Sequence, residues 1–181
     1  GYIPTNVISI TDGQMFVTSE LFNKGIRPAI DVGISVSRVG SAAQTKSMKA
    51  VAGGLKLELA QFRELEAFMQ FASDLDKATA DRIASGQRMV EVLKQKNGHP
   101  IPLEKQVAMI FIANKGFLHQ APVNKVVEVE RLFMEFMDGQ YSHVLEAIKT
   151  SAVLSDESKE AILKAGEEFK LAHPELFTIK L

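Results

Sequence analysis

The spacing of apolar residues changes at residue 45, and this change limits the possible folds more than any other feature. Beyond it, apolar residues recur every three or four positions, the period of an amphipathic α-helix. We predict helices over residues 45–71, with a break at Gly53 and Gly54, and over residues 79–94, 103–114, 123–137, 142–150 and 155–172. Gly116 and Gly139 are the expected ends of two of them. Helices joined by such short loops predict an all-helical bundle.

The first 44 residues carry a different pattern. Short runs rich in valine and isoleucine at residues 7–10, 15–17 and 30–37 predict three strands. Three short strands cannot bury both faces of a sheet alone, so they indicate the edge of a larger α/β sheet. We therefore expect an α/β fragment over residues 1–44, followed by an all-α helical bundle domain over residues 45–181. Since Gly1 is not a methionine and the strand pattern begins at once, we also expect the chain to begin within a domain.

Arg38 lies where the last predicted strand stops and the next helix has not begun. Gly40 follows as a break, and Ser41 is a candidate helix cap. A guanidinium stays charged and offers a rigid fork of donors that suits phosphate oxygens. From the spacing alone, a surface ion pair is the alternative role for this arginine.

The composition argues against several classes of function. The formal net charge is −1, which gives no reason to expect a nucleic-acid partner or an anionic membrane surface. The chain has no cysteine, so disulfides, thiolate chemistry and cysteine-based zinc sites are excluded. No apolar run approaches the ~20 residues that span a bilayer, and no signal peptide is visible.

The sequence also lacks the two common glycine-rich phosphate-binding patterns, G-x-x-x-x-G-K-[ST] and G-x-G-x-x-G. We therefore do not expect this chain to bind and split ATP by itself. The histidines do not have the spacing of paired metal ligands, so we assign no metal to them. They are His99, His119, His143 and His173.

Three segments resemble the alpha-subunit family of the rotary F-type ATP synthases. They are SVSRVGSAAQ at residues 35–44, PTNVISITDGQ at residues 4–14 and GIRPAI at residues 25–30. The segments occur in the family's order, and the resemblance extends over the whole chain. It implies that residues 1–44 are the end of a RecA-like nucleotide-binding domain and that residues 45–181 are the carboxy-terminal helical domain.

The resemblance also assigns a role to Arg38. In the family, the matching arginine acts in trans as an arginine finger, reaching the γ-phosphate held by a neighbouring beta subunit. The resemblance places Ser37 and Val36 along the approach to that phosphate, and Ser9 and Gly13 near the same catalytic interface. The alternatives are a serine that bonds its own backbone for Ser9 and a plain turn glycine for Gly13.

A second group of residues resembles the family's adenine pocket, which holds a nucleotide without turning it over. Arg27, Pro28 and Gln95 match the family there, while Asn97 stands where the family commonly has a glutamine. The implied cofactor is ATP or ADP with Mg²⁺, whose ligands would lie outside this chain. From the residues alone, the alternative is a helix-end arginine with a proline stop and two loop amides.

The resemblance further implies that Asp74, Leu75 and Asp76 face a central rotating gamma shaft. Spacing alone favours helix capping and solvation for these carboxylates, because no histidine or third carboxylate accompanies them. The implied partners are beta subunits and further alpha copies in a ring of six, the gamma shaft and a peripheral-stalk subunit. The implied location is the surface of an energy-transducing membrane, either the cytoplasmic side of a bacterial plasma membrane or the matrix side of the mitochondrial inner membrane.

The implied function is that of a non-catalytic, regulatory alpha subunit of the proton-translocating complex that makes or hydrolyses ATP. Two alternatives stay open from the sequence. One is a stand-alone helical module that binds other proteins. The other is a fragment of a related hexameric export ATPase, in which one chain would carry both the finger and the phosphate loop.

Overall fold

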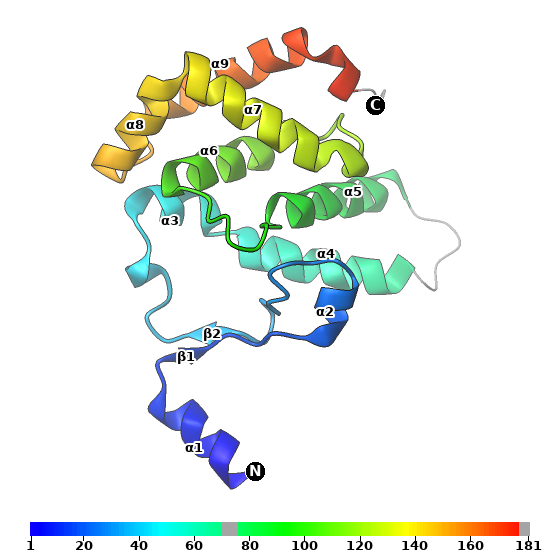
Figure 1. Cartoon of the computed structure of the whole chain (residues 1–181). Helices are drawn as coiled ribbons and strands as arrows, with labels where there is room; N and C mark the ends of the chain where they lie inside the picture. Colours follow the sequence, from blue (N-terminus) through cyan, green and yellow to red (C-terminus); the bar gives the residue numbers. More distant parts are fainter. Residues whose placement is uncertain (70–75, 178–181) are drawn as a thin grey trace.

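The computed structural model describes residues 1–69 and 76–177 of the chain. Its amino-terminal part has less regular secondary structure than the rest. The amino-terminal part holds short elements: α1 (Tyr2–Ile10), β1 (Gly13–Gln14), α2 (Ser19–Asn23), β2 (Val36–Ser37) and the 3₁₀ turn η1 (Gly40–Ala43). The rest is helical: α3 (Lys46–Ala52), α4 (Leu55–Met69), α5 (Lys77–Val92), α6 (Leu103–Asn114), η2 (Val123–Lys125), α7 (Val126–Gln140), α8 (Ser142–Ser151), α9 (Asp156–Ala172) and η3 (Pro174–Leu176). Figure 1 shows α3 to α9 stacked in layers, with the amino-terminal part at one end. The predicted fold class, a small α/β piece before a helical bundle, is confirmed.

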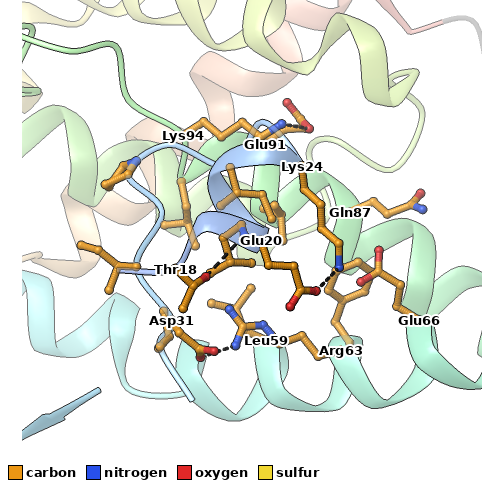
Figure 2. A pocket seen from close by; sticks show the side chains of 18 of the residues that line it. Thr18, Glu20, Lys24, Asp31, Leu59, Arg63, Glu66, Gln87, Glu91 and Lys94 are labelled. Carbon is orange, nitrogen blue, oxygen red and sulfur yellow. Dashed lines mark hydrogen bonds and ion pairs between the residues drawn. The ribbon is translucent and has the colours of Figure 1, made fainter. Parts of the chain in front are cut away.

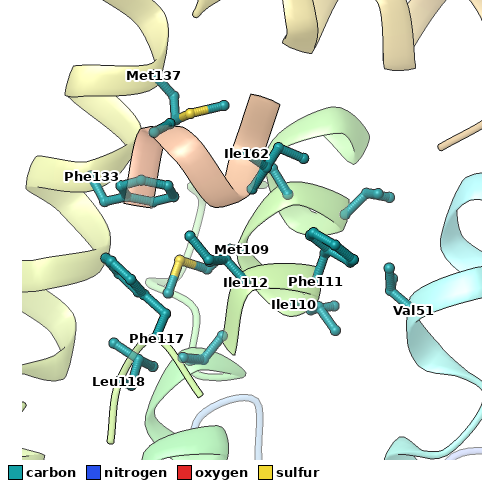
Figure 3. Close-up of a cluster of buried hydrophobic side chains, with 14 of the residues drawn as sticks. Val51, Met109, Ile110, Phe111, Ile112, Phe117, Leu118, Phe133, Met137 and Ile162 are labelled. Carbon is teal, nitrogen blue, oxygen red and sulfur yellow. The ribbon is translucent and has the colours of Figure 1, made fainter. Parts of the chain in front are cut away.

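Helix α6 is the centre of the bundle. Six consecutive residues, 107–112, are buried, so this helix is surrounded on all sides and packs against α3, α5, α7, α8 and α9. Figure 3 shows its side chains meeting those of α7 and α9. The ring centroids of Phe117 and Phe133 lie 4.9 Å apart, and those of Phe133 and Phe169 lie 5.5 Å apart. This aromatic cluster fixes the α7–α9 layer on the central helix.

Local capping chemistry sets several helix boundaries. Thr45 Oγ1 accepts a hydrogen bond from the Met48 backbone N–H at 3.2 Å, so α3 begins after Thr45 and not at the predicted cap Ser41. Residues around Ser41 form η1 instead. Gly116 has a φ of 81° just beyond α6, as expected of a helix-ending glycine. The predicted stop at Gly139 is wrong by a residue, because α7 continues to Gln140.

The sheet is smaller than the sequence predicted. Within the described residues the strands are β1 and β2, which pair antiparallel with Gly13 opposite Ser37. The predicted strands over residues 15–17 and 30–37 are wrong over most of their length, and Val17 and Ile30 form an isolated bridge. Between them the backbone turns. A strand needs a neighbour for its N–H and C=O groups, and these segments have only each other.

The first predicted strand, residues 7–10, is also wrong, because it lies within the helix α1. No residue of α1 is buried, and the side chains of Tyr2, Ile3 and Ile10 are more than 70% exposed. A helix bonds its own backbone, whereas a strand here would have no neighbour to pair with. The helix therefore satisfies the backbone hydrogen-bonding groups of this segment without a partner strand.

Polar contacts attach the amino-terminal part to the bundle. Arg63 of α4 bonds Asp31 through Nη1 and Oδ1 at 2.6 Å, and this ion pair holds the pKa of Asp31 below its usual range. Lys56 Nζ donates to Ser35 O at 3.3 Å. Leu21 of α2 is buried beneath these contacts. Among the described residues, no helix is long and apolar enough to cross a membrane.

Candidate functional site

The antiparallel pair β1–β2 gathers the predicted catalytic residues near the amino-terminal end of the molecule. Gly13 pairs with Ser37, and the next residue along, Gln14, pairs with Val36. A Cβ atom added to Gly13 would lie 2.5 Å from Val36 O, closer than real Cβ atoms approach backbone oxygens. Gly13 is therefore required by the tight approach of the two strands, beyond the turn role that its sequence position indicates.

Arg38 follows β2 directly, as the sequence predicted. Its backbone N–H donates to Asp12 O at 2.8 Å, which fixes the Cα of Arg38 beside the β1–β2 pair. Its guanidinium is exposed and makes one long hydrogen bond, from Nη2 to Ile8 O at 3.4 Å. No carboxylate in the described part of the chain pairs with it, so the surface ion pair that spacing alone favoured is absent there.

Two serines lie on either side of this arginine. Ser37 Oγ accepts a hydrogen bond from the Gly40 backbone N–H at 3.0 Å and so shapes the bend that follows Arg38. Ser9 is the neighbour of Ile8 and donates its hydroxyl to Asn6 O at 2.9 Å within α1. That contact is the backbone-bonded alternative for Ser9, although in a helix and not in a sheet. The β1–β2 pair thus brings Gly13, Val36 and Ser37 close to Arg38, and the hydrogen bond to Ile8 O brings α1, with Ser9, near it. The roles of these residues stay predictions.

The predicted adenine-binding residues form a second group. The Gln95 backbone N–H donates to Arg27 O at 2.8 Å, so two segments far apart in the sequence meet here. The Arg27 guanidinium carbon lies 4.2 Å from the centroid of the Phe22 ring. Pro28 and Asn97 are exposed on the same two segments, and the Asn97 carbonyl bonds His99 Nδ1 at 2.9 Å. The structure therefore joins Arg27 and Gln95, while what they bind stays a prediction.

The predicted shaft contact is described only at its end. Asp74 and Leu75 lie outside the described residues. Asp76 is exposed and is the N-cap residue of α5, but its side chain makes no capping hydrogen bond. Residues 1–69 and 76–177 contain no group of three or more histidine or acidic side chains that could hold a metal ion.

The sequence analysis missed two features that link distant segments. The Asp31–Arg63 pair joins residues 32 positions apart, and no local motif signals such a contact. Arg88 is only 6% exposed, and its Nε donates to Ala121 O at 2.8 Å. Burial lowers the pKa of Arg88, although an arginine in a helical pattern normally indicates a solvated side chain.

Two family models match the chain, and the boundary between their matches lies close to residue 45, where the spacing of apolar residues changes. The family model described as "ATP synthase alpha/beta chain, C terminal domain" matches residues 44–169. The model described as "ATP synthase alpha/beta family, nucleotide-binding domain" matches residues 1–37.

Individual relatives agree with these matches. The chain is 55% identical over 174 residues to a protein of Helicobacter pylori (strain Shi470) named "ATP synthase subunit alpha", and equally so to one of Helicobacter acinonychis (strain Sheeba) with the same name. Each match covers 96% of this chain and 35% of the relative. The chain thus spans about a third of the length of these relatives, and the resemblance inferred from its motifs is confirmed.

Proposed function

Because the chain belongs to the ATP synthase alpha/beta family, we propose that it is the carboxy-terminal part of an alpha subunit in a proton-translocating ATP synthase. In this proposal, residues 1–44 end the nucleotide-binding domain and residues 45–181 are the helical domain. The subunit alternates with beta subunits in a ring of six around a gamma shaft and also contacts a peripheral stalk. The assembled complex lies at an energy-transducing membrane and makes or hydrolyses ATP.

Within that complex, Arg38 would stabilise the transferring phosphoryl group on a neighbouring beta subunit. Phosphoryl transfer spreads negative charge over the equatorial oxygens, and a positioned cation lowers the energy of that state. The observation that carries this proposal is the exposed guanidinium at the end of β2, held by one hydrogen bond of 3.4 Å to Ile8 O. A phosphate oxygen would replace so weak a neutral acceptor easily, because charge-assisted bonds are shorter and stronger.

The residues around Arg38 would then act by positioning it. Gly13 allows the close pairing of β1 and β2, Ser37 fixes the bend that follows Arg38, and the Val36 side chain is exposed beside it. Ser9 lies next to the carbonyl that now accepts from Arg38. These contacts hold the backbone around Arg38, while the guanidinium keeps only its long hydrogen bond to Ile8 O. A group that acts on another subunit needs such a fixed base and an available side chain.

A second nucleotide would be retained at Arg27, Pro28, Gln95 and Asn97. The hydrogen bond between the Gln95 N–H and Arg27 O supports a shared site, since it joins the two segments that carry these residues. The shorter Asn97 side chain reaches less far than the usual glutamine by one methylene. The Mg²⁺ that accompanies the nucleotide would take its ligands from other parts of the protein. Asp74, Leu75 and Asp76 would contact the shaft.

Exposed apolar side chains also favour a subunit over a free-standing module. Many apolar side chains of residues 1–39 face solvent, and this much exposed apolar surface favours a region that other protein covers. The residues are Tyr2, Ile3, Val7, Ile10, Met15, Val17, Ile34, Val36 and Val39, each more than 50% exposed.

The test is the Arg38→Ala variant of the whole alpha subunit, assembled with beta subunits and assayed for ATP hydrolysis at saturating ATP. We expect a loss of about 10³-fold or more in turnover, the range measured for arginine fingers, with nucleotide binding retained. Arg131→Ala is the matched control, because Arg131 is an exposed arginine of α7 that pairs with Glu135. Turnover of the Arg38→Ala complex within tenfold of the unmodified complex would refute the role.

A further inference from the structure

A large cleft separates the amino-terminal part from the helical bundle. Its volume is about 1030 Å³, and it lies between α2 with the following loop on one side and α4 and α5 on the other (Figure 2). A volume of this size is that of a small-molecule site. Of the residues assigned above to nucleotide binding, Pro28 lines the cleft, whereas Arg27, Arg38, Gln95 and Asn97 do not.

The inner wall of the cleft is apolar. Leu21 of α2 and Leu59 and Phe62 of α4 are each less than 10% exposed, and Val90 of α5 lies beside them in the lining. Phe62 packs directly against α5, because its ring and Cβ fill the space where a side chain on Gly86 would stand. The wall therefore presents a fixed apolar surface that suits a flat ring system.

Charged side chains form the rim, and most of them are already paired. Lys24 bonds Glu20 at 2.8 Å, Arg63 bonds Asp31 at 2.6 Å, and Lys94 bonds Glu91. Figure 2 shows these pairs around the cleft, with Glu66 of α4 below Lys24. Glu66 has no ion pair with any residue in the described ranges 1–69 and 76–177. The lining thus carries four carboxylates against three cations, which leaves one excess negative charge. Lys24 bonds Glu20 and also feels the charge of Glu66, which helps to raise the pKa of Lys24, so the excess lies at the Glu66 end of this group and is shared with Glu20.

We propose that this cleft binds a small amphipathic cation, with an apolar ring system against Leu59 and Phe62 and an ammonium group at the Glu66 carboxylate. An apolar wall beside a single excess carboxylate matches that chemistry. A nucleotide fits less well, because its phosphates would meet a rim with excess negative charge. The site therefore adjoins the proposed adenine pocket at Pro28 but takes a ligand of opposite charge.

Three naphthalene probes of matched size test the proposal on the 181-residue chain. They are 1-naphthylmethylamine, which is a cation, 1-naphthalenemethanol, which is neutral, and 1-naphthoate, which is an anion. Their fluorescence can be followed directly, because the chain contains no tryptophan. We expect the amine to bind about three- to fivefold more tightly than the alcohol at low salt, with the naphthoate weakest. The advantage of the amine should shrink as salt is added.

Variants then locate the charge. Glu66→Gln should remove the preference for the amine and leave the binding of the alcohol unchanged, whereas Glu64→Gln should alter neither. Glu64 is the matched control, since it is an exposed glutamate of α4 that does not line the cleft. Equal binding of all three probes, a preference that survives Glu66→Gln, or displacement of the amine by ADP would each overturn the proposal.

Discussion

The contact between Gly86 and Phe62 gives the sharpest stability prediction. Gly86 lies in the middle of α5, where glycine is about 1 kcal/mol worse than alanine in an exposed helix. A Cβ atom at this position would lie 2.4 Å from Phe62 Cδ2, 2.5 Å from Cγ and 2.7 Å from Cβ. The glycine is therefore a packing requirement of the α4–α5 pair.

The expected size of the effect follows from which atoms collide. Phe62 Cβ and Cγ are close to the backbone of α4, so no rotation of the ring relieves the contact, and the helices must separate. Overpacking costs about 1–3 kcal/mol, and a contact with atoms this close to the backbone belongs to the upper part of that range, about 2–3 kcal/mol, from which about 1 kcal/mol of helix propensity is recovered. We expect Gly86→Ala to lower the unfolding free energy by about 1–2 kcal/mol, or Tm by about 2–8 °C.

Thermal and urea unfolding followed by circular dichroism measure this loss. The control is Gly139→Ala, because a Cβ on Gly139 of α7 meets nothing within 4 Å. It should be neutral or stabilise the chain by about 0.5 kcal/mol. In the Phe62→Ala background, Gly86→Ala should cost much less, which gives a coupling free energy of about 1 kcal/mol or more.

A Gly86→Ala variant as stable as the unmodified chain would refute the reasoning. So would equal effects of Gly86→Ala in the presence and absence of the Phe62 ring. The first result would mean that α4 and α5 separate without loss of packing elsewhere, and the second would mean that the cost does not come from the Phe62 ring.

Two further predictions concern charged groups. Burial raises the pKa of Glu130 to about 7, so the folded state binds its proton more tightly than the unfolded state, and stability should fall as pH rises from about 4.5 to 7. Glu130→Gln should raise Tm at pH 8 and leave it unchanged at pH 4, and the exposed Glu128→Gln should leave Tm unchanged at both pH values. Asp31→Asn removes the ion pair with Arg63 and should speed proteolysis within residues 1–40 without lowering the Tm of the bundle. Unchanged proteolysis would mean that the other contacts, such as the burial of Leu21 and the hydrogen bond from Gln95 N–H to Arg27 O, attach this segment without the ion pair.

The helical part was predictable because its signals are local. Apolar residues at helical spacing, a capping Ser155 and a glycine such as Gly116 act within a few residues of their own position. The predicted helix over residues 103–114 has the bounds of α6, Leu103–Asn114. The sequence of α6 could not show that this helix is buried on all sides, because that burial depends on which other helices surround it.

The strands were predicted poorly for the opposite reason. A run such as residues 7–10 has the composition of a strand, but a strand is stable only beside another strand, and the described chain supplies none for it. The same run closes its hydrogen bonds within itself as α1. The composition indicated a tendency to form a strand, but without a partner strand the segment forms a helix.

For the candidate site, the sequence identified Arg38 from its place after a valine-rich run and from its motif. It did not indicate that the guanidinium would rest on Ile8 O, or that Arg27 and Gln95 would share a hydrogen bond. It gave no sign of the cleft beneath Glu66, whose walls come from α2, α4 and α5.

The sequence by itself determined the helices of the bundle, caps such as Ser155, the residues that could carry charge to a phosphate, and the family. Only the tertiary structure decided which segments meet, which apolar runs find a partner, and where an unpaired carboxylate lies over an apolar wall. The physical reason is range: a cap or a helical period acts over a few residues, whereas burial and pairing depend on segments that the chain brings together only when it folds.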